Sequence, residues 1–356
     1  METKTKMNWA YLAGFIESDG AIECFIDREN RQLKYVVKFT SEKNTNTLAE
    51  VELFLKTQGF SSGRTDQKAK NRAPSVRIQG NDKVVKFLKK LKQHVVCLEN
   101  HGDNPKSPLL GVKYRNLCLI LAVEELNREL TIQEKIDFKK TFHKENYDQP
   151  DITIPQTTIP RMGYEKDFNL DINSSFGAAK QWIAKVDEHY AQHVKHVKEF
   201  CGKLNADYLV GLFDGDGGFN ISFSPKAKDE IVEIQCEVNL TLPTKDSFIF
   251  DVVKTHFEIP RVKIQSQQHS KQMKIRAQID VKKILFFFDQ HPLLGNYKSE
   301  SLALVKETLN KKKNSFFTKG KVQVTEFKNF VKKVYDHSDL LRKDIQTVFN
   351  AIDMFY

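Results

Sequence analysis

One short pattern occurs twice in the chain and limits the folds that the chain can adopt. It reads LAGFIESDG over residues 12–20 and LVGLFDGDG over residues 209–217. Both copies begin with an apolar run that holds a glycine in third place, continue with acidic residues and end on glycine. A glycine inside a helix costs stability. We therefore expect Gly14 and Gly211 to let another backbone approach closely.

The last residues of each copy indicate a metal site. Asp19 and Asp216 stand directly before the closing glycines, and a glycine there is typical of a helix that ends and turns into a strand. The helix dipole disfavours a carboxylate at the helix C-terminus. Two such carboxylates on two packed helices would therefore favour one or more divalent cations between them.

These two stretches resemble the LAGLIDADG motifs of homing endonucleases, in the single-chain form that carries two motifs. Two near-complete copies at domain spacing, each followed by a strand-like run, make the resemblance specific. It implies an α+β fold of two pseudo-symmetric domains. Each domain would have a four-stranded antiparallel sheet, and the two sheets would form a saddle on DNA.

The resemblance also implies an activity. A monomer would hydrolyse both strands of double-stranded DNA at a long asymmetric target, with Mg²⁺ or Mn²⁺ as cofactor, leaving 3′-hydroxyl and 5′-phosphate ends. The alternative within the family is a maturase that binds its own intron RNA, and a third alternative is a DNA-binding regulator without catalysis. By analogy with the family, the gene would belong to a chloroplast or mitochondrial genome.

The residues that follow each motif alternate between apolar and polar side chains. Alternation over residues 20–27 and 34–40, and again over residues 217–224, 233–241 and 272–279, predicts strands with one solvated face. Each half then reads as helix, hairpin, helix, hairpin, helix, which is typical of an α+β domain. Phe25 is an unexplained apolar residue on the polar face of its strand.

We expect two repeated domains, at residues 1–126 and 205–310. The stretch 127–204 between them does not repeat and is expected to be a linker or insertion with helices. A helical tail at 311–356 starts with a basic cluster and has no predicted role beyond covering core or contacting phosphates.

The composition agrees with a polyanionic partner. The chain of 356 residues has a net charge of +10 and a pI near 9.1, which favours nucleic acid first and an anionic membrane surface second. The sequence has no apolar run of the roughly 18 residues that span a bilayer. Its 5 cysteines are widely spaced without a C-x-x-C pair, which argues against a disulfide framework or a thiolate zinc site.

The resemblance assigns the metal site to Asp19 and Asp216, as catalytic ligands, together with the adjoining Gly20 and Gly217. The competing interpretation is that the aspartates only hydrogen-bond the following turn. Metal ions there could activate water and stabilise the leaving oxygen.

The other acidic residues of the motifs are Glu17 and Asp214, two positions earlier. We expect them to face the helix ends or solvent, with a catalytic role as the less favoured alternative.

Two lysines are further catalytic candidates. Lys113 and Lys298 each follow a Pro-Leu-Leu-Gly run, the first after one residue and the second after two, and repeat symmetry would bring each near the carboxylates. A lysine there could stabilise developing negative charge or orient the attacking water. The alternative is a solvated lysine at the start of a helix.

A polar residue at the end of the second strand completes the predicted catalytic set. The resemblance implies that Glu42 positions water, with Lys43 as a competitor because the register is uncertain by one residue. The corresponding stretch 242–244 offers only Thr244. This departure from symmetry predicts that one DNA strand is cut faster.

The polar sheet faces are the predicted DNA-reading surface, since Arg and Lys recognise guanine edges and Gln and Asn recognise adenine. A plain solvated face would also be polar, but a scarcity of acidic residues, in the second half especially, favours nucleic acid. The candidates are Lys34, Lys38, Thr40, Arg64, Arg77, Asn220, Ser222, Gln235, Asn239, Lys263, Gln265, Lys274, Arg276 and Gln278.

Three histidines have helical spacing between the two halves. His189, His193 and His196, with Cys201 nearby, form a conceivable zinc site. Histidines at this spacing are more often part of a polar or half-buried helix face, and we favour that interpretation.

Overall fold

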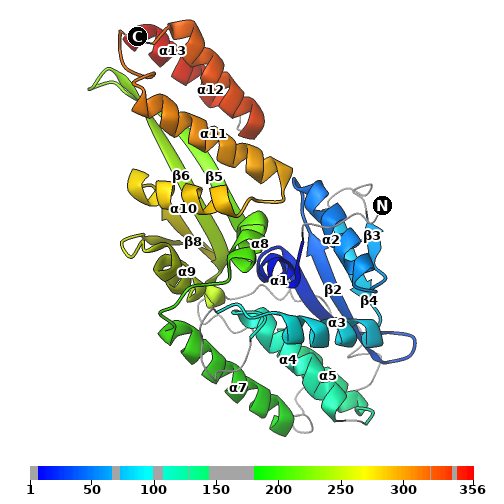
Figure 1. Ribbon diagram of the computed structural model, residues 1–356. Helices are drawn as coiled ribbons and strands as arrows, with labels where there is room; N and C mark the ends of the chain where they lie inside the picture. Colours follow the sequence, from blue (N-terminus) through cyan, green and yellow to red (C-terminus); the bar gives the residue numbers. More distant parts are fainter. Residues whose placement is uncertain are drawn as a thin grey trace.

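Two four-stranded antiparallel sheets lie on either side of a central pair of helices (Figure 1). The computed structural model describes residues 7–65, 73–98, 107–126, 128–143, 180–320, 322–338 and 343–356. The central helices are α1 (Trp9–Glu17) and α8 (Ala206–Asp216), one from each copy of the repeated pattern. The predicted fold is confirmed.

The sheets have the same strand order. The first runs β1-β2-β4-β3 and the second runs β5-β6-β8-β7. The strands are β1 (Gly20–Ile26), β2 (Leu33–Thr40), β3 (Gly63–Thr65), β4 (Ser75–Gln79), β5 (Gly217–Lys226), β6 (Ile231–Pro243), β7 (Ile264–Ser266) and β8 (Ser270–Ile275).

Helices cover one face of each sheet and leave the other face open. They are α2 (Thr45–Thr57), α3 (Asn81–His94), α4 (Val112–Glu125), α5 (Ile132–His143), α7 (Lys180–Glu199), α9 (Ile249–Phe257), α10 (Gln278–Gln290), α11 (Asn296–Lys313), α12 (Val324–Ser338) and α13 (Lys343–Phe355), with a 3-10 turn at Thr244–Asp246. Among the described residues, no helix combines the length and apolarity that a bilayer span requires.

The central helices touch through the two pattern glycines, as predicted. A Cβ added to Gly14 would lie 1.9 Å from the carbonyl oxygen of Tyr208, and one added to Gly211 would lie 2.0 Å from the carbonyl oxygen of Tyr11. Because the obstructing atoms belong to the backbone, no rotamer change could make room. The helix–helix contact therefore requires glycine at both positions.

The strand alternation sorts side chains between the core and the open face. In β1, Ile22, Cys24 and Ile26 are buried under the helices, whereas Phe25 is 43% exposed on the open face. The second hairpin is longer, since β5 and β6 pair from Gly217 to Lys226 while β1 and β2 pair from Gly20 to Ile26.

Extra helices cover the far end of each hairpin (Figure 1). In the first half, Phe138 of α5 packs against Tyr35 of β2, with ring centroids 6.4 Å apart. In the second half, Phe327 of α12 packs against Phe223 of β5, also at 6.4 Å. The segment 127–204 and the tail thus both supply core-covering helices, while the domain boundaries that we set remain predictions.

Candidate active site at the ends of the motif helices

The C-terminal ends of α1 and α8 bring Asp19 and Asp216 together. Gly215, which precedes Asp216, packs so tightly on the other helix end that an added Cβ would lie 1.8 Å from Oγ of Ser18 and 3.0 Å from the backbone nitrogen of Asp19. Both aspartates are half-buried. The two carboxylates therefore share one small region between the sheets.

The pKa shifts in this region reflect the closeness of the two carboxylates. Burial is the main cause that raises the pKa of Asp216 to about 7, the negative charge of Asp19 raises it further, and Lys113 and Lys298 oppose the shift. Burial also raises the pKa of Asp19, against the pull of the same lysines. The site therefore disfavours two bare negative charges, and added positive charge would stabilise it.

Lys113 and Lys298 lie at the helix ends, as repeat symmetry predicted. Nζ of Lys113 donates to the carbonyl oxygens of Ile16, Glu17 and Ser18 at 2.7, 2.8 and 2.7 Å. These are C-terminal carbonyls of α1, which attract a cation through the helix dipole. Neither ammonium is simply solvated, because burial lowers the pKa of both lysines.

Lys298 occupies the equivalent position on the other helix. Its Nζ donates to the carbonyl oxygen of Phe213 at 3.1 Å and to that of Gly215. Each lysine therefore satisfies backbone acceptors that the helix leaves open, and each places a positive charge beside the aspartates.

The expectation for Glu17 was wrong, because this carboxylate is 1% exposed and faces protein. Oε2 of Glu17 accepts from the backbone nitrogen of Leu110 at 2.6 Å and from the hydroxyl of Tyr208 at 3.1 Å. Since these partners come from distant parts of the chain, no local sequence pattern indicates them. Glu17 fixes the loop that carries Lys113.

The expectation for Asp214 was wrong for the same reason, because it is fully buried. Its Oδ2 accepts from the hydroxyl of Tyr11 at 2.8 Å and from the backbone nitrogen of Leu294 at 2.7 Å. The second motif thus fixes the loop that carries Lys298. Both of these inner carboxylates are structural supports for the lysine loops.

Two buried side chains that sequence reasoning missed complete these loops. A Cβ on Gly111 would lie 2.6 Å from Oδ1 of Asp246 and 2.8 Å from Oε1 of Glu17. In the other half, a Cβ on Gly295 would lie 2.7 Å from Cγ of Asn44 and 2.9 Å from Oδ1 of Asp214. The glycine in each Pro-Leu-Leu-Gly run therefore leaves room for a pair of polar side chains.

A cavity of about 340 Å³ opens beside Asp19. Glu42, Lys43, Tyr297 and Lys298 are among the side chains that line it. The charge of Glu42 contributes to the raised pKa of Asp19, which places the two carboxylates within electrostatic reach. The structure thus puts Glu42 and Lys43 side by side at the predicted site.

Thr40 lies next to this site, at the end of β2. Its Oγ1 donates to the carbonyl oxygen of Asp19 at 2.7 Å and helps to hold the turn after α1. Gly20 and Gly217 are the buried first residues of β1 and β5. A Cβ on Gly20 would lie 2.5 Å from Cα of Ile16, so the turn itself requires glycine; metal ligation by the two glycines stays a prediction.

Most of the predicted DNA-reading residues do lie on the open sheet faces. The paired register places the following candidates there: Lys34, Lys38, Arg77, Asn220, Ser222, Gln235, Asn239, Lys263, Gln265 and Lys274. Asn239 is 6% exposed, because its amide packs over Gly218.

Two candidates lie elsewhere. Arg64 pairs with the core residue Val76 and therefore points to the helical side, where it forms a 3.6 Å ion pair with Glu52 of α2. Gln278 is the first residue of α10, because β8 ends at Ile275. The apolar-polar alternation had continued past the true strand end and placed Gln278 on the sheet.

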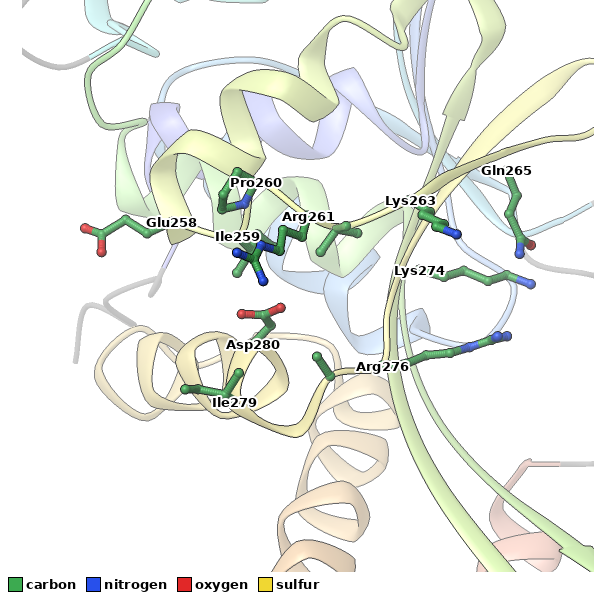
Figure 2. A pocket seen from close by; sticks show the side chains of 12 residues that line it. Glu258, Ile259, Pro260, Arg261, Lys263, Gln265, Lys274, Arg276, Ile279 and Asp280 are labelled. Atoms are coloured by element: carbon green, nitrogen blue, oxygen red, sulfur yellow. The ribbon is translucent and has the colours of Figure 1, made fainter.

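The expected scarcity of acidic residues on the second sheet was also wrong. Glu237 lies opposite Asn220 on the open face and binds Nε of Arg276 at 2.6 Å. A pocket of about 540 Å³ at this edge is lined by Arg261, Lys263 and other residues. Gln265, Lys274 and Arg276 also line this pocket, and Figure 2 shows their side chains extending toward the same side.

Two of the three histidines of α7 pack against α4 and its loop. His189 shares a 3.0 Å hydrogen bond with the hydroxyl of Tyr114, and the ring of His193 lies 4.3 Å from the Tyr114 ring. Burial lowers the pKa of His193 to about 4. Across the described part of the chain, no group of three or more His, Cys, Asp or Glu side chains is arranged to hold a metal ion.

The residues at the helix ends nevertheless fit a magnesium-type ion that binds together with nucleic acid. Such an ion is commonly held by one or two carboxylates, with phosphate oxygens and water as the remaining ligands. Asp19 and Asp216 supply two carboxylates, both half-buried and disfavoured without a counter-charge. A site of this composition is complete only when phosphates are present.

Comparison with known proteins identifies this arrangement. The family model described as LAGLIDADG endonuclease matches residues 209–309. Residues 209–309 therefore match a LAGLIDADG endonuclease domain, and the fold of the chain is that of two-domain LAGLIDADG meganucleases. The family model matches the second half, and the repeated sheet and motif helix show that the first half has the same LAGLIDADG architecture.

Solved structures with this fold match the chain over almost its full length. The meganuclease I-AabMI bound to uncleaved DNA is 15% identical, with 94% of this chain and 99% of that chain covered and a TM-score of 0.62. The meganuclease I-CpaMI bound to uncleaved DNA is 13% identical, with 95% and 100% covered and a TM-score of 0.61.

A third structure represents a later stage of the reaction. The homing endonuclease I-SmaMI bound to cleaved DNA is 13% identical, with 91% of this chain and 96% of that chain covered and a TM-score of 0.61. A comparison with curated protein sequences finds no match.

Proposed function

We propose that this protein is a site-specific endonuclease that cuts both strands of double-stranded DNA. The observation that carries the proposal is the meeting of Asp19 and Asp216 at two touching helix ends, each beside a buried lysine. The net charge of +10 and the two open polar sheet faces support a DNA partner. The relatives in complex with DNA support the same substrate.

Different residues of the chain would bind the metal ions, stabilise negative charge and orient water. The carboxylates of Asp19 and Asp216 would hold the divalent ions, Mg²⁺ or Mn²⁺, which supply Lewis-acid activation of water and stabilise the leaving oxygen. Lys113 and Lys298 keep the helix ends in place and put positive charge where negative charge develops. Glu42, which lines the cavity beside Asp19, would orient a water molecule at one of the two cutting positions.

The open sheet faces would provide recognition. Side chains such as Lys38, Arg77 and Gln265 present donors at the spacing of antiparallel strands, which fits direct contacts in the major groove. Because the two sheets carry different residues at corresponding positions, we expect an asymmetric target. A single chain with both sheets needs no second copy to contact both halves of it.

The proposal is tested first by finding the target. A library of random duplexes is incubated with the protein and Mg²⁺, and the cut ends are mapped by sequencing. We expect discrete cuts on both strands within one long motif, with 3′-hydroxyl and 5′-phosphate ends. A library that binds the protein but shows no discrete cuts would overturn the proposal.

The second test uses Asp19→Asn and Asp216→Asn, which keep side-chain size and remove charge. Losing a supporting residue of a metal site commonly costs 10–100-fold, and a ligand itself should cost at least on the order of 100-fold. Each variant should still bind the target in a gel-shift assay. Cutting at the wild-type rate by either variant would show that the aspartates are not the metal ligands.

A further inference from the structure

The loop before α4 is held from two sides at the backbone of Leu110. The backbone nitrogen of Leu110 donates to Oε2 of Glu17 at 2.6 Å, and its carbonyl oxygen lies 3.0 Å from Nε2 of His193. Because a carbonyl oxygen can only accept, Nε2 of the imidazole is the donor. His193 belongs to α7, which lies between the two repeated halves. A helix outside the repeat therefore contacts the loop that carries Lys113.

His193 also packs against the residue that follows Lys113. The ring centroids of His193 and Tyr114 lie 4.3 Å apart, and the two residues are 8% and 2% exposed. Lys113 thus stands between two contacts of one buried imidazole, with Leu110 before it and Tyr114 after it. This arrangement holds the chain on both sides of the lysine.

The loop of Lys298 is held in the same way by a side chain from another element. The backbone nitrogen of Leu294 donates to Oδ2 of Asp214 at 2.7 Å, and its carbonyl oxygen accepts from Nδ2 of Asn46, also at 2.7 Å. Asn46 lies in α2, a helix of the first half. Each loop thus has a leucine whose N–H and C=O both bind side chains, but the two donors to the carbonyl come from unrelated elements.

The repeat itself accounts for this difference. Asn44 and Asp246 occupy corresponding places beside the loop glycines. Two residues further along the chain stand Asn46 in the first half and Phe248 in the second. A phenylalanine side chain has no hydrogen-bond donor, so the repeat cannot supply the carbonyl of Leu110 with the partner that Asn46 provides in the other half.

The helix α7 lies against this phenylalanine. It contacts both α4 and α9 (Figure 1), and Nζ of its Lys198 lies 6.0 Å from the centre of the Phe248 ring. His193 is on the same helix. The helix that packs on Phe248 therefore also brings a donor to Leu110.

The position of Lys113 depends on this loop. Its Nζ binds three successive carbonyl oxygens at the end of α1, at 2.7–2.8 Å, and its charge acts on Asp19 and Asp216. Without His193 the buried carbonyl of Leu110 would lose this partner, which is unfavourable, and the loop would be free to shift. A displacement of about 1 Å at an active site can cost on the order of 100-fold in rate.

We propose that His193 is a positioning residue of the active site, which acts through the backbone of Leu110 to keep the ammonium of Lys113 at the end of α1. In this way α7 gives the first half the support that Asn46 gives the second. This inference rests on the proposed nuclease function, in which Lys113 places positive charge where negative charge develops.

Simple packing of α7 is the competing explanation. A histidine that only fills space would lower the melting temperature when it is lost, but cutting well below that temperature would be unchanged. The two explanations therefore differ in the rate of the cutting step.

The experiment measures single-turnover cutting, with protein in excess over the target duplex and saturating Mg²⁺, and measures DNA binding separately without metal. His193→Ala should slow cutting on the order of 10-fold or more and change the dissociation constant for DNA by less than about 2-fold. His193→Gln should stay within about 3-fold of the wild-type rate, because a glutamine amide can place a neutral donor near the position of Nε2.

Two further variants are compared with His193→Ala, each well below its melting temperature. Asn46→Ala removes the donor to the carbonyl of Leu294 and should slow cutting by a similar factor. His189→Ala is the control, because the hydrogen bond of this histidine, one turn earlier on α7, goes to the hydroxyl of Tyr114 rather than to the loop. It should change the cutting rate by less than about 2-fold.

Combining His193→Ala with Lys113→Ala tests the route of the effect. If His193 acts through Lys113, the double variant should cut within about 2-fold of the rate of Lys113→Ala alone. A wild-type rate for His193→Ala, an equal loss for His189→Ala, or multiplied losses in the double variant would overturn the inference. Failure of the nuclease function would look different, because the wild-type protein would then cut no target.

Discussion

The loops beneath the two motif helices have the same shape and different charge. Under the first motif helix, Glu17 and Asp246 meet around Gly111, and under the second, Asp214 and Asn44 meet around Gly295. The first pair has two carboxylates and the second has one carboxylate and one amide. The comparison teaches that the repeat reproduces the backbone geometry of the site while the charges at its base differ.

The pair of two carboxylates, Glu17 and Asp246, is unfavourable when both are ionised. Burial raises the pKa of Asp246 to about 7, and the charge of Glu17 raises it further. Within the described residues, Oε1 of Glu17 and Oδ2 of Asp246 have no hydrogen-bond partner, and neither has Oδ1 of Asn44 in the other loop. Two neighbouring buried carboxylates disfavour each other's ionisation, and only the first loop has two, so this loop should be the more pH-sensitive.

The largest loss of unfolding free energy is expected at the contact between α1 and α8, where the two halves are most alike. Gly14→Ala and Gly211→Ala each push a methyl group into a backbone oxygen of the other helix. Overpacking typically costs 1–3 kcal/mol, and a backbone obstruction should reach or exceed the upper end of about 3 kcal/mol. Chemical denaturation of each variant should show comparable losses of unfolding free energy for both.

The control for these variants is Gly63→Ala. Gly63 has no heavy atom within 4 Å of an added Cβ and no left-handed backbone angle, so its replacement should change the unfolding free energy by less than about 0.5 kcal/mol. A loss for Gly14→Ala as small as that of the control would show that the motif helices do not touch as described.

Asp246→Asn converts the first loop into the charge pattern of the second. The folded-state pKa of Asp246 is raised from 3.8 to about 7. Its contribution to stability is therefore fully present below pH 4 and is lost as the pH rises to 7. The variant lacks this loss and should be more stable than wild type at pH 8, by about 1–3 kcal/mol.

The reverse substitution, Asn44→Asp, sharpens the same comparison. It places a second carboxylate beside Asp214 and should lower the melting temperature at pH 8 while leaving it nearly unchanged at pH 4. The comparison would fail if Asp246→Asn lowered stability at pH 8, because the carboxylate would then have a favourable partner.

The sheets differ in length, which predicts the smallest effect. The β5–β6 hairpin extends three residue pairs further than β1–β2. At about 3.3 Å per residue this adds roughly 10 Å, or about three base pairs of DNA. Substituting each base pair of the target in turn should show a half-site that is longer by about this amount on one side, and equal half-sites would contradict it.

Parts of this account followed from the sequence alone. The period of two in the strands gave the sheets, and the repeated pattern gave the helix contact and the two aspartates. The Pro-Leu-Leu-Gly runs correctly placed Lys113 and Lys298 at the helix ends, because each half carries a lysine within a few residues of the same run.

Other features depend on contacts between distant residues and could not be predicted in this way. Glu17 was expected at a helix end or in solvent because it is charged, and only the fold shows its partner Tyr208 191 residues away. The same holds for the stacking of His337 on Tyr297, which links α12 to the cavity beside Asp19. Arg64 was misplaced because its strand is only three residues long and gives no clear alternation.

The central claim is that Asp19 and Asp216 hold the same metal site together. Anomalous diffraction from Mn²⁺ in crystals of the protein with its target duplex tests this claim most directly. The account predicts manganese within coordination distance of a carboxylate oxygen of each aspartate and of a phosphate oxygen. Manganese bound to neither carboxylate, or at a place remote from the scissile phosphates, would contradict it.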